Sequence, residues 1–198
     1  MTEPTGIVLA GGQSRRMGGG DKALADLGGQ PMIAHVIARL GCARAISANG
    51  DPARFAPFRL PVLPDSVAGW QGPLAGVLAG MDWAAARGIA RIVTAPADSP
   101  FFPRTLAARL LATPARVALA CHDGRDHPAF AAWDTGLAEE LRAALGRGER
   151  RMIDWMLAQG ALRVAVAGDD PFFNVNTPAD LDRARLRLAG QSPGAPVL

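Results

Sequence analysis

Short apolar runs, separated by glycine, proline or polar residues, recur along the chain and predict β-strands. The first is residues 6–10, which contain β-branched side chains and stop at Gly11 and Gly12. Further runs of this kind are residues 44–47, 60–63, 91–94, 117–120, 130–133 and 162–166. Runs of this length are typical of strands that are covered on both faces.

Longer segments with apolar residues at helical spacing lie between these runs. Residues 31–40 are one such segment, which starts with proline and is ended by Gly41. Their apolar positions Met32, Val36 and Leu40 share one helical face. The other predicted helices are residues 73–87, 103–112, 135–145, 151–159 and 178–188, with Thr177 as the cap of the last.

Strands that alternate with helices predict an α/β domain with a mostly parallel central sheet between helical layers. Sheets of this kind bind ligands beyond the carboxyl ends of their strands. The 198 residues suit one core, so we expect a single domain over residues 1–189. Glycine and proline in residues 190–198 predict a disordered tail.

Composition narrows the class of protein. Hydrophobic residues make up 49% and charged residues 20%, a balance typical of a globular chain. The net charge is +3 with the arginines spread along the chain, which argues against nucleic acid as a partner. There is no apolar stretch of roughly 20 residues and no signal segment, so we expect no membrane partner and a cytoplasmic location.

The cysteines give no sign of a disulfide framework or of a zinc site. Cys42 and Cys121 are the only two, as a reducing compartment leads one to expect. His122, Asp126 and His127 lie near Cys121, but their spacing matches no structural zinc site.

Lys22 is the one lysine of the chain, since every other member of the 21 Lys plus Arg residues is arginine. Arginine and lysine are interchangeable at most solvated positions, but not where a compact charge is needed. A chain that otherwise avoids lysine therefore marks Lys22 as a candidate functional residue.

Residues 9–24, directly after the first strand, are rich in glycine and cations. Glycines let the backbone approach a phosphate closely, and their N–H groups form an anion-binding concavity. Arg15, Arg16 and Lys22 add positive charge. A Walker A loop would need Gly-Lys-Ser/Thr where this chain has Asp-Lys-Ala, and no Gly-x-Gly-x-x-Gly follows the strand. The segment suits a triphosphate but matches neither of these motifs.

This segment does resemble a known signature. Leu-Ala-Gly-Gly-x-Ser-Arg-Arg-Met-Gly followed by Asp-Lys is similar to the MobA family, the molybdenum cofactor guanylyltransferases. Further blocks of the family recur in order at residues 71–76, 96–100, 125–128, 148–151 and 174–178. The resemblance covers nearly the whole chain, to about residue 188.

The resemblance implies a Rossmann-like nucleotidyltransferase fold, GTP as donor and Mg²⁺ as cofactor. It also implies transfer of GMP to the terminal phosphate of molybdopterin, with release of pyrophosphate and formation of the molybdopterin guanine dinucleotide. The implied partners are therefore GTP and molybdopterin, with transient contact to other proteins of molybdenum cofactor biosynthesis or to acceptor proteins.

Roles for single residues follow from position in these blocks and from the chemistry of the ligands. The expected GTP-binding residues are Leu9, Ala10, Gly11, Gly12, Lys22, Asn49, Asp65, Gly72, Gly76 and Asp98. Lys22, Asp98, Arg15 and Arg16 are the candidate catalytic residues, and Asp98 is the candidate metal ligand. Arg150, Arg151, Asn174 and Asn176 are the candidate acceptor-binding residues, because an anionic pterin needs cations and amides.

Each assignment has a simpler structural alternative. Asp98 could cap a helix, and residues 72–76 could be only a turn and helix start packed on the sheet. Arg15 and Arg16 could lie in a solvated loop, and the acceptor candidates could be a helix start and a cap.

Other functions remain open as well. A cytidylyltransferase or a sugar-phosphate nucleotidyltransferase of the same fold is one alternative, and a non-catalytic GTP-binding adaptor is another. No Ser, His and Asp arrangement indicates a covalent intermediate. We therefore expect the acceptor phosphate to attack the α-phosphorus in line.

Replacing Lys22 by arginine tests whether its compact charge matters. We expect Lys22→Arg to lower turnover well beyond any loss of stability, because a planar guanidinium cannot replace an ammonium that meets phosphate at one point. Steady-state turnover measured beside the melting temperature separates the two effects. Wild-type turnover in Lys22→Arg would refute a special role for the lysine.

Overall fold

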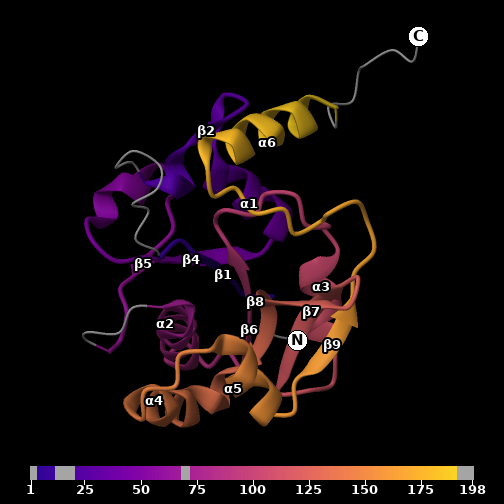
Figure 1. Cartoon of the computed structure of the whole chain (residues 1–198). Helices are drawn as coiled ribbons and strands as arrows, with labels where there is room; N and C mark the ends of the chain where they lie inside the picture. The colour runs from indigo at the N-terminus through magenta and orange to yellow at the C-terminus, as the bar shows by residue number, and fades with distance from the viewer. Residues whose placement is uncertain (1–3, 12–20, 68–71, 191–198) are drawn as a thin grey trace.

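The structure is a computed structural model that describes residues 4–11, 21–67 and 72–190. A seven-stranded sheet crosses the middle of the molecule, in the order β5-β4-β1-β6-β8-β7-β9 (Figure 1). Its strands are β1 (Gly6–Leu9), β4 (Ala43–Ser47), β5 (Val62–Leu63), β6 (Arg91–Pro96), β7 (Val117–His122), β8 (Arg125–Asp134) and β9 (Leu162–Ala165). A separate hairpin joins β2 (Asp26–Leu27) to β3 (Gln30–Pro31).

The predicted mostly parallel sheet is confirmed. Only β8 runs antiparallel to its neighbours β6 and β7, and the other strand pairs of this sheet are parallel. β8 begins at Arg125, well before the predicted start at residue 130, because a tight hairpin at Asp123 and Gly124 pairs polar residues with the end of β7. The apolar pattern predicted only the buried part of β8, residues 130–133.

The six predicted helices are all present. They are α1 (Met32–Leu40), α2 (Pro73–Ala85), α3 (Leu106–Ala112), α4 (Ala138–Gly146), α5 (Met152–Ala158) and α6 (Pro178–Gly190). α6 includes Gly190, which the sequence placed in the tail, and residues 191–198 lie outside the described residues. None of the helices in the described ranges is long and apolar enough to cross a membrane.

The described residues also form three short 3-10 helices. They are η1 (Lys22–Leu24), η2 (Pro52–Phe58) and η3 (Thr135–Leu137). The last occupies the first turn of the helix predicted from residue 135. The sequence predicted neither η1 nor η2.

Helices cover both faces of the sheet. Ile7 and Leu9 of β1 point into a core formed with α2, α4 and α5, which lie below the sheet in Figure 1. Val8, between them, points to the opposite core, which α1 and α3 cover. This alternation is the geometry of a strand that is buried on both faces, and it explains the continuous apolar run at residues 6–10.

A third, smaller core attaches α6 and the β2–β3 hairpin above the sheet. Its buried residues are Leu27, Met32, Phe101, Val175, Leu181 and Ala184. Val175 is fully buried here, so the chain between β9 and α6 is anchored where it passes the carboxyl end of β6.

The strand order places a topological switch point at β1. The chain goes from β1 to β4 and β5 on one side, and then to β6 on the other side. Parallel sheets bind ligands beyond the carboxyl ends of strands at such a point. The glycine-rich segment leaves β1 at this position.

A buried hydroxyl ties β6 to β8 and offers a test of the sheet. Trp133 is fully buried, and its Nε1 donates to Thr94 Oγ1 at 2.9 Å. Thr94→Val keeps the shape but leaves this N–H without an acceptor, so we expect a loss of about 1–3 kcal/mol in the free energy of unfolding. Denaturant unfolding measures it, with Thr94→Ser as control. Equal stability of wild type and Thr94→Val would contradict this role.

Candidate functional site

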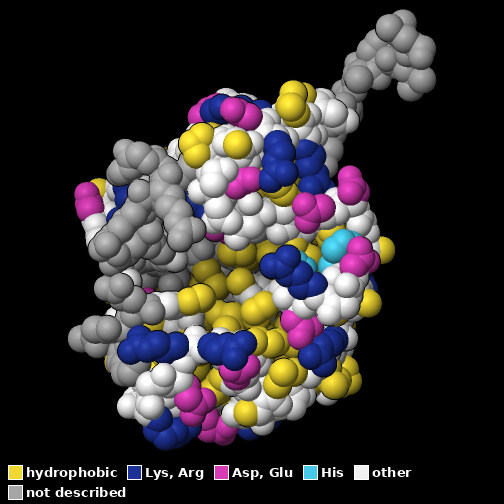
Figure 2. Space-filling view, viewed as in Figure 1, with side chains coloured by type: hydrophobic (Ala, Val, Ile, Leu, Met, Phe, Trp, Pro, Cys, Tyr) yellow, Lys and Arg dark blue, Asp and Glu magenta, His cyan; other side chains and the backbone are white. Residues whose placement is uncertain are grey.

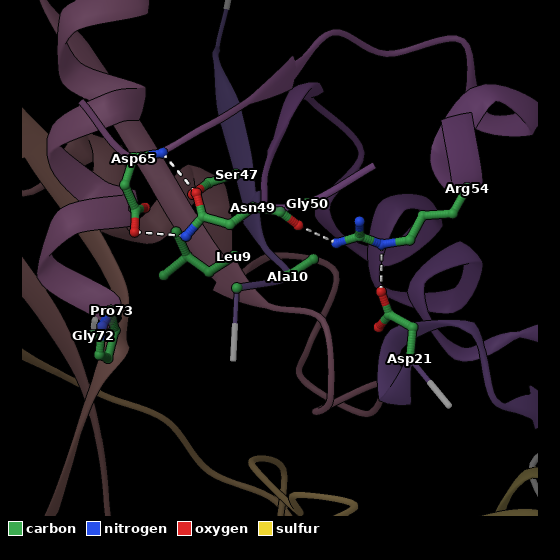
Figure 3. A pocket seen from close by; sticks show the side chains of 12 residues that line it. Leu9, Ala10, Asp21, Ser47, Asn49, Gly50, Arg54, Asp65, Gly72 and Pro73 are labelled. Atoms are coloured by element: carbon green, nitrogen blue, oxygen red, sulfur yellow. Dashed lines mark hydrogen bonds and ion pairs between the residues drawn. The ribbon is translucent and has the colours of Figure 1, made fainter. Parts of the chain in front are cut away.

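A cavity of about 570 Å³ opens at the carboxyl ends of β1, β4 and β5 (Figure 3). Its lining residues are Leu9, Ala10, Gly11, Asp21, Ser47, Asn49, Gly50, Arg54, Asp65, Gly72, Pro73 and Gly76. Seven of the candidate GTP-binding residues are therefore brought together: Leu9, Ala10, Gly11, Asn49, Asp65, Gly72 and Gly76. They come from four separate segments of the chain.

The end of β1 forms the floor of the cavity and is held on both sides. Ala10 N donates to Ser47 O at 2.8 Å, and Ala97 N donates to Leu9 O at 2.9 Å. A Cβ on Gly76 would lie 2.5 Å from Ser47 Oγ, so the start of α2 packs closely on β4. Gly76 thus has the packing role that the sequence left open, and it also lines the cavity.

Asn49 and Asp65 form a reciprocal pair on the cavity wall, which Figure 3 shows. Asn49 Nδ2 donates to Asp65 Oδ2 at 2.7 Å, and Asp65 N donates to Asn49 Oδ1 at 2.9 Å. The pair joins the loops after β4 and β5. A carboxylate has about four lone-pair positions, so Asp65 keeps acceptor capacity for a ligand.

Arg54 lies on another wall of the cavity, and the sequence did not predict a role for it. Its Nε donates to Asp21 Oδ2 at 2.6 Å, and its two terminal nitrogens donate to the carbonyls of Asp51 and Asn49 at 2.7 and 2.6 Å. The guanidinium therefore ties the loop after β4 to the residue that precedes Lys22. In a chain so rich in arginine, no sequence pattern distinguishes Arg54 from the rest.

Lys22 lies among oxygen atoms from two distant segments. Its Nζ donates to Asp98 Oδ2 at 2.7 Å, to Asn176 Oδ1 at 2.5 Å and to Asn174 Oδ1 at 3.3 Å. An ammonium has three donors, and all three are matched. The side chains of Lys22 and Asp98 are only 13% and 25% exposed, so water screens the ion pair partly. Four of the predicted site residues are thus in direct contact.

Asp98 lies two residues beyond the carboxyl end of β6, as expected. The alternative that it caps a helix is wrong, because α3 begins at Leu106 and its N-cap residue is Thr105. Ser99 Oγ lies 3.5 Å from Asp98 Oδ1, and the main chain of Asp98 accepts from Val175 N at 2.9 Å.

The segment that carries Asn174 and Asn176 is fixed by its neighbours. Asp180 Oδ2 accepts from the main-chain N–H groups of Asn176 at 3.1 Å and Thr177 at 2.9 Å. Asp180 N in turn donates to Thr177 Oγ1 at 3.1 Å, which confirms the predicted cap of α6. Arg183, Thr177 and Asn176 donate to the Asp180 carboxylate, and they lower its pKa from 3.8 to about 2.

Two of the predicted acceptor-binding residues are not among the contacts described for Lys22. Arg150 and Arg151 precede α5 and are exposed, and Arg151 pairs with Asp154 in the first turn of α5 at 3.2 Å. Gly12, Arg15 and Arg16 lie outside the described residues.

The residues near Cys121 form a different cluster on the β7–β8 hairpin. Hydrogen bonds from Arg163 at 2.8 Å lower the pKa of Asp126, and the ring of His127 packs on Phe172, where burial lowers its pKa. In the described part of the chain, no three His, Cys, Asp or Glu side chains form a group that could hold a metal ion.

Comparison with known proteins shows what the chain is similar to. Residues 6–163 match the MobA-like NTP transferase domain. The chain is 51% identical over 187 residues to a molybdenum cofactor guanylyltransferase of Cereibacter sphaeroides, a match that covers 92% of this chain and 96% of that protein. It is 50% identical over 193 residues to a protein of the same name from Rhodopseudomonas palustris, covering 91% and 90% of the two chains.

The fold also has solved relatives. Molybdopterin-guanine dinucleotide biosynthesis protein A from Archaeoglobus fulgidus superposes with a TM-score of 0.75 at 24% identity, and the match covers 94% of this chain and 100% of that one. At this identity the similarity confirms the Rossmann-like nucleotidyltransferase fold and nothing finer.

Asp180 and Asp182, both on α6, offer a matched pair of variants. Asp180→Ala removes the acceptor for two main-chain N–H groups, so we expect the amides of Asn176 and Thr177 to exchange hydrogen about tenfold faster or more. Asp182→Ala breaks only an ion pair with Arg185 and should leave this exchange unchanged. Hydrogen exchange with residue resolution measures both.

The stability that the Asp180 carboxylate contributes should depend on pH. Because the folded-state pKa of Asp180 is depressed, its stabilising effect is complete above the ordinary value of 3.8 and is lost as the pH falls towards about 2. The difference in melting temperature between wild type and Asp180→Ala should therefore persist from neutral pH to about pH 4. A difference that disappeared between pH 7 and 5 would contradict the capping role.

Proposed function

This chain belongs to the MobA-like NTP transferase family, and we propose that it transfers GMP from GTP to the terminal phosphate of molybdopterin. Pyrophosphate leaves, and molybdopterin guanine dinucleotide forms. One observation carries the proposal: Lys22, Asp98, Asn174 and Asn176 meet beside the cavity at the switch point of the sheet. The similarity to guanylyltransferases over most of the chain supports the choice of substrates.

The cavity suits the donor nucleotide. Its volume of about 570 Å³ lies within the range of small-molecule sites. Base and ribose would lie against the exposed backbone at Gly11 and Gly72 and against the pair Asn49 and Asp65. The triphosphate would then point towards Asp21, next to Lys22 and the glycine-rich segment with Arg15 and Arg16.

Mg²⁺ is the proposed cofactor, and the donor atoms fit it. Asp98 offers a carboxylate, and Asn174 and Asn176 offer amide oxygens, which are the hard ligands that Mg²⁺ prefers. When bound with the nucleotide, Mg²⁺ neutralises charge on phosphate oxygens. Asp98 would be its principal ligand.

The residues of the chain act mainly by position and charge. The acceptor phosphate is already a nucleophile, so the protein has to orient two anions that repel each other. Lys22 and the arginines of the glycine-rich segment offset the charge of the departing pyrophosphate. Asn174 and Asn176, with Arg150 and Arg151, are the proposed acceptor contacts.

A hollow on one face suits the acceptor. Figure 2 shows it between the part of the molecule that carries α6 and the part that carries α4 and α5. Hydrophobic side chains lie on its floor, and Lys or Arg side chains follow its lower rim. An apolar floor with a cationic rim matches a flat pterin that carries a phosphate. We also propose a cytoplasmic location, where GTP is supplied, and transient contact with the proteins that receive the cofactor.

A donor screen tests the proposal. Pyrophosphate release is measured with GTP, ATP or CTP in the presence of Mg²⁺ and molybdate-loaded molybdopterin. We expect kcat/KM for GTP to exceed the other values by about 10²-fold or more, because the wrong base leaves buried polar groups unpaired. Asp98→Asn, which loses the charge that holds the cation, should release no pyrophosphate with any donor.

Three results would overturn the proposal. Comparable rates with CTP and GTP would favour the cytidylyltransferase, and transfer to a sugar phosphate offered in place of molybdopterin would favour the sugar-phosphate nucleotidyltransferase. No release with any triphosphate by the wild-type protein would indicate a GTP-binding adaptor.

A further inference from the structure

The contacts of Lys22 point beyond its role as a phosphate ligand. We propose that its ammonium is the resident cation of the ligand-free site: it holds the position of the divalent cation, which enters only when a triphosphate draws Lys22 away. The inference rests on the proposed function for the triphosphate and for the need of a divalent cation. It states that the Lys22 ammonium and the metal ion bind to the same oxygen atoms, but not at the same time.

The first support is the geometry around Nζ. Oxygens of Asp98, Asn176 and Asn174 lie 2.7, 2.5 and 3.3 Å from this one nitrogen. One carboxylate and two amide oxygens that converge on a point are a ligand set for a hard cation. The ammonium uses each of its three hydrogens on them, so Lys22 has no N–H left for a phosphate while it stays there.

The second support is charge. Asp98 is only 25% exposed, and the oxygen ends of two amide dipoles lie beside its carboxylate. Without a cation these oxygen atoms would repel one another in a partly desolvated site. A lysine ammonium and a divalent cation cannot occupy the same point, so the two must exclude each other.

The third support is the difference in freedom between Lys22 and its partners. Val175 is fully buried between the two asparagines, and Asp180 holds the main chain of Asn176. The main chain that carries the two asparagines is therefore held in place, whereas a lysine side chain has a flexible four-carbon stem. The ammonium is the part that can move out when a stronger anion binds nearby.

This arrangement also gives a reason for a lysine and not an arginine at position 22. A guanidinium spreads its donors over three nitrogens in a plane, so it cannot bring three N–H groups to one point. The consequence for binding is coupling: the free site takes up divalent cations poorly, and metal and triphosphate enter together.

Binding of Mn²⁺ to the nucleotide-free protein tests the exchange. The loss of the free-ion signal in electron paramagnetic resonance gives the affinity of wild type and Lys22→Met. We expect Lys22→Met to bind Mn²⁺ more tightly by about tenfold or more, since no ion pair has to be broken for the metal to enter. Equal or weaker affinity in Lys22→Met would overturn the inference.

Two double variants separate occupancy from the general effect of removing a positive charge. In Lys22→Met/Asp98→Asn the gain in Mn²⁺ affinity should disappear, which would place the metal at Asp98. In Lys22→Met/Asn176→Leu the gain should fall by at least half, because an amide ligand is lost while the charges stay the same. A full gain in either double variant would place the metal elsewhere and overturn the inference.

Thermal unfolding gives a second test, which also applies if Lys22→Met is less stable than wild type. Lys22→Met should melt at a lower temperature than wild type in the presence of a chelator, and Mg²⁺ should restore much of the loss. Wild type should respond little to Mg²⁺. A Lys22→Met protein that Mg²⁺ does not stabilise would overturn the inference. No nucleotide or turnover enters these measurements, so a protein that used CTP instead of GTP would give the same results.

Discussion

The rest of the site depends on one ammonium group that joins three distant parts of the chain. Lys22 is separated from Asp98 by 76 residues and from Asn176 by 154. A different part of the fold positions each of these residues. The parallel pairing of β1 with β6 brings Asp98 next to the end of β1, and the small core under α6 holds the segment with Asn176. A short 3-10 helix capped by Asp21 presents Lys22 to both.

The cavity and the cluster of Lys22, Asp98, Asn174 and Asn176 lie along the same edge of the sheet. The cavity lies where β1, β4 and β5 end, and the cluster lies where β6 ends. The pair Asp21 and Arg54 connects them, because Arg54 holds the cavity loop and Asp21 is bonded to Lys22 in the chain. A nucleotide in the cavity would therefore place its charge next to the ammonium. This proximity is the physical basis of the coupling between nucleotide and metal that we propose.

Hydrophobic periodicity predicted the elements of the fold, because buried strands and amphipathic helices repeat with fixed periods. All six helices and the runs at residues 6–10 and 91–94 are found where expected. It could not predict the polar half of β8, whose residues pair at the end of the sheet without an apolar pattern.

The residues of the site could be predicted less completely than the helices and strands. Lys22 was conspicuous as the one lysine of the chain, and Asp98 followed from the resemblance. Arg54 could not be found in this way, since its role depends on a contact with Asp21 that no local pattern encodes. Asp180 was missed for a similar reason: it acts on the main chain of Asn176 and not on a ligand.

The environment of the lysine ammonium can be observed directly, because Lys22 gives the one lysine signal of the protein. With ¹⁵N-labelled lysine, nuclear magnetic resonance follows Nζ in the free protein and after addition of Mg²⁺ with a non-hydrolysable GTP analogue. We expect a slowly exchanging ammonium signal in the free protein, held by three acceptors. The signal should change to a new environment only when metal and nucleotide are both present. A fast-exchanging signal typical of a solvated lysine in the free protein would contradict the central role of this contact.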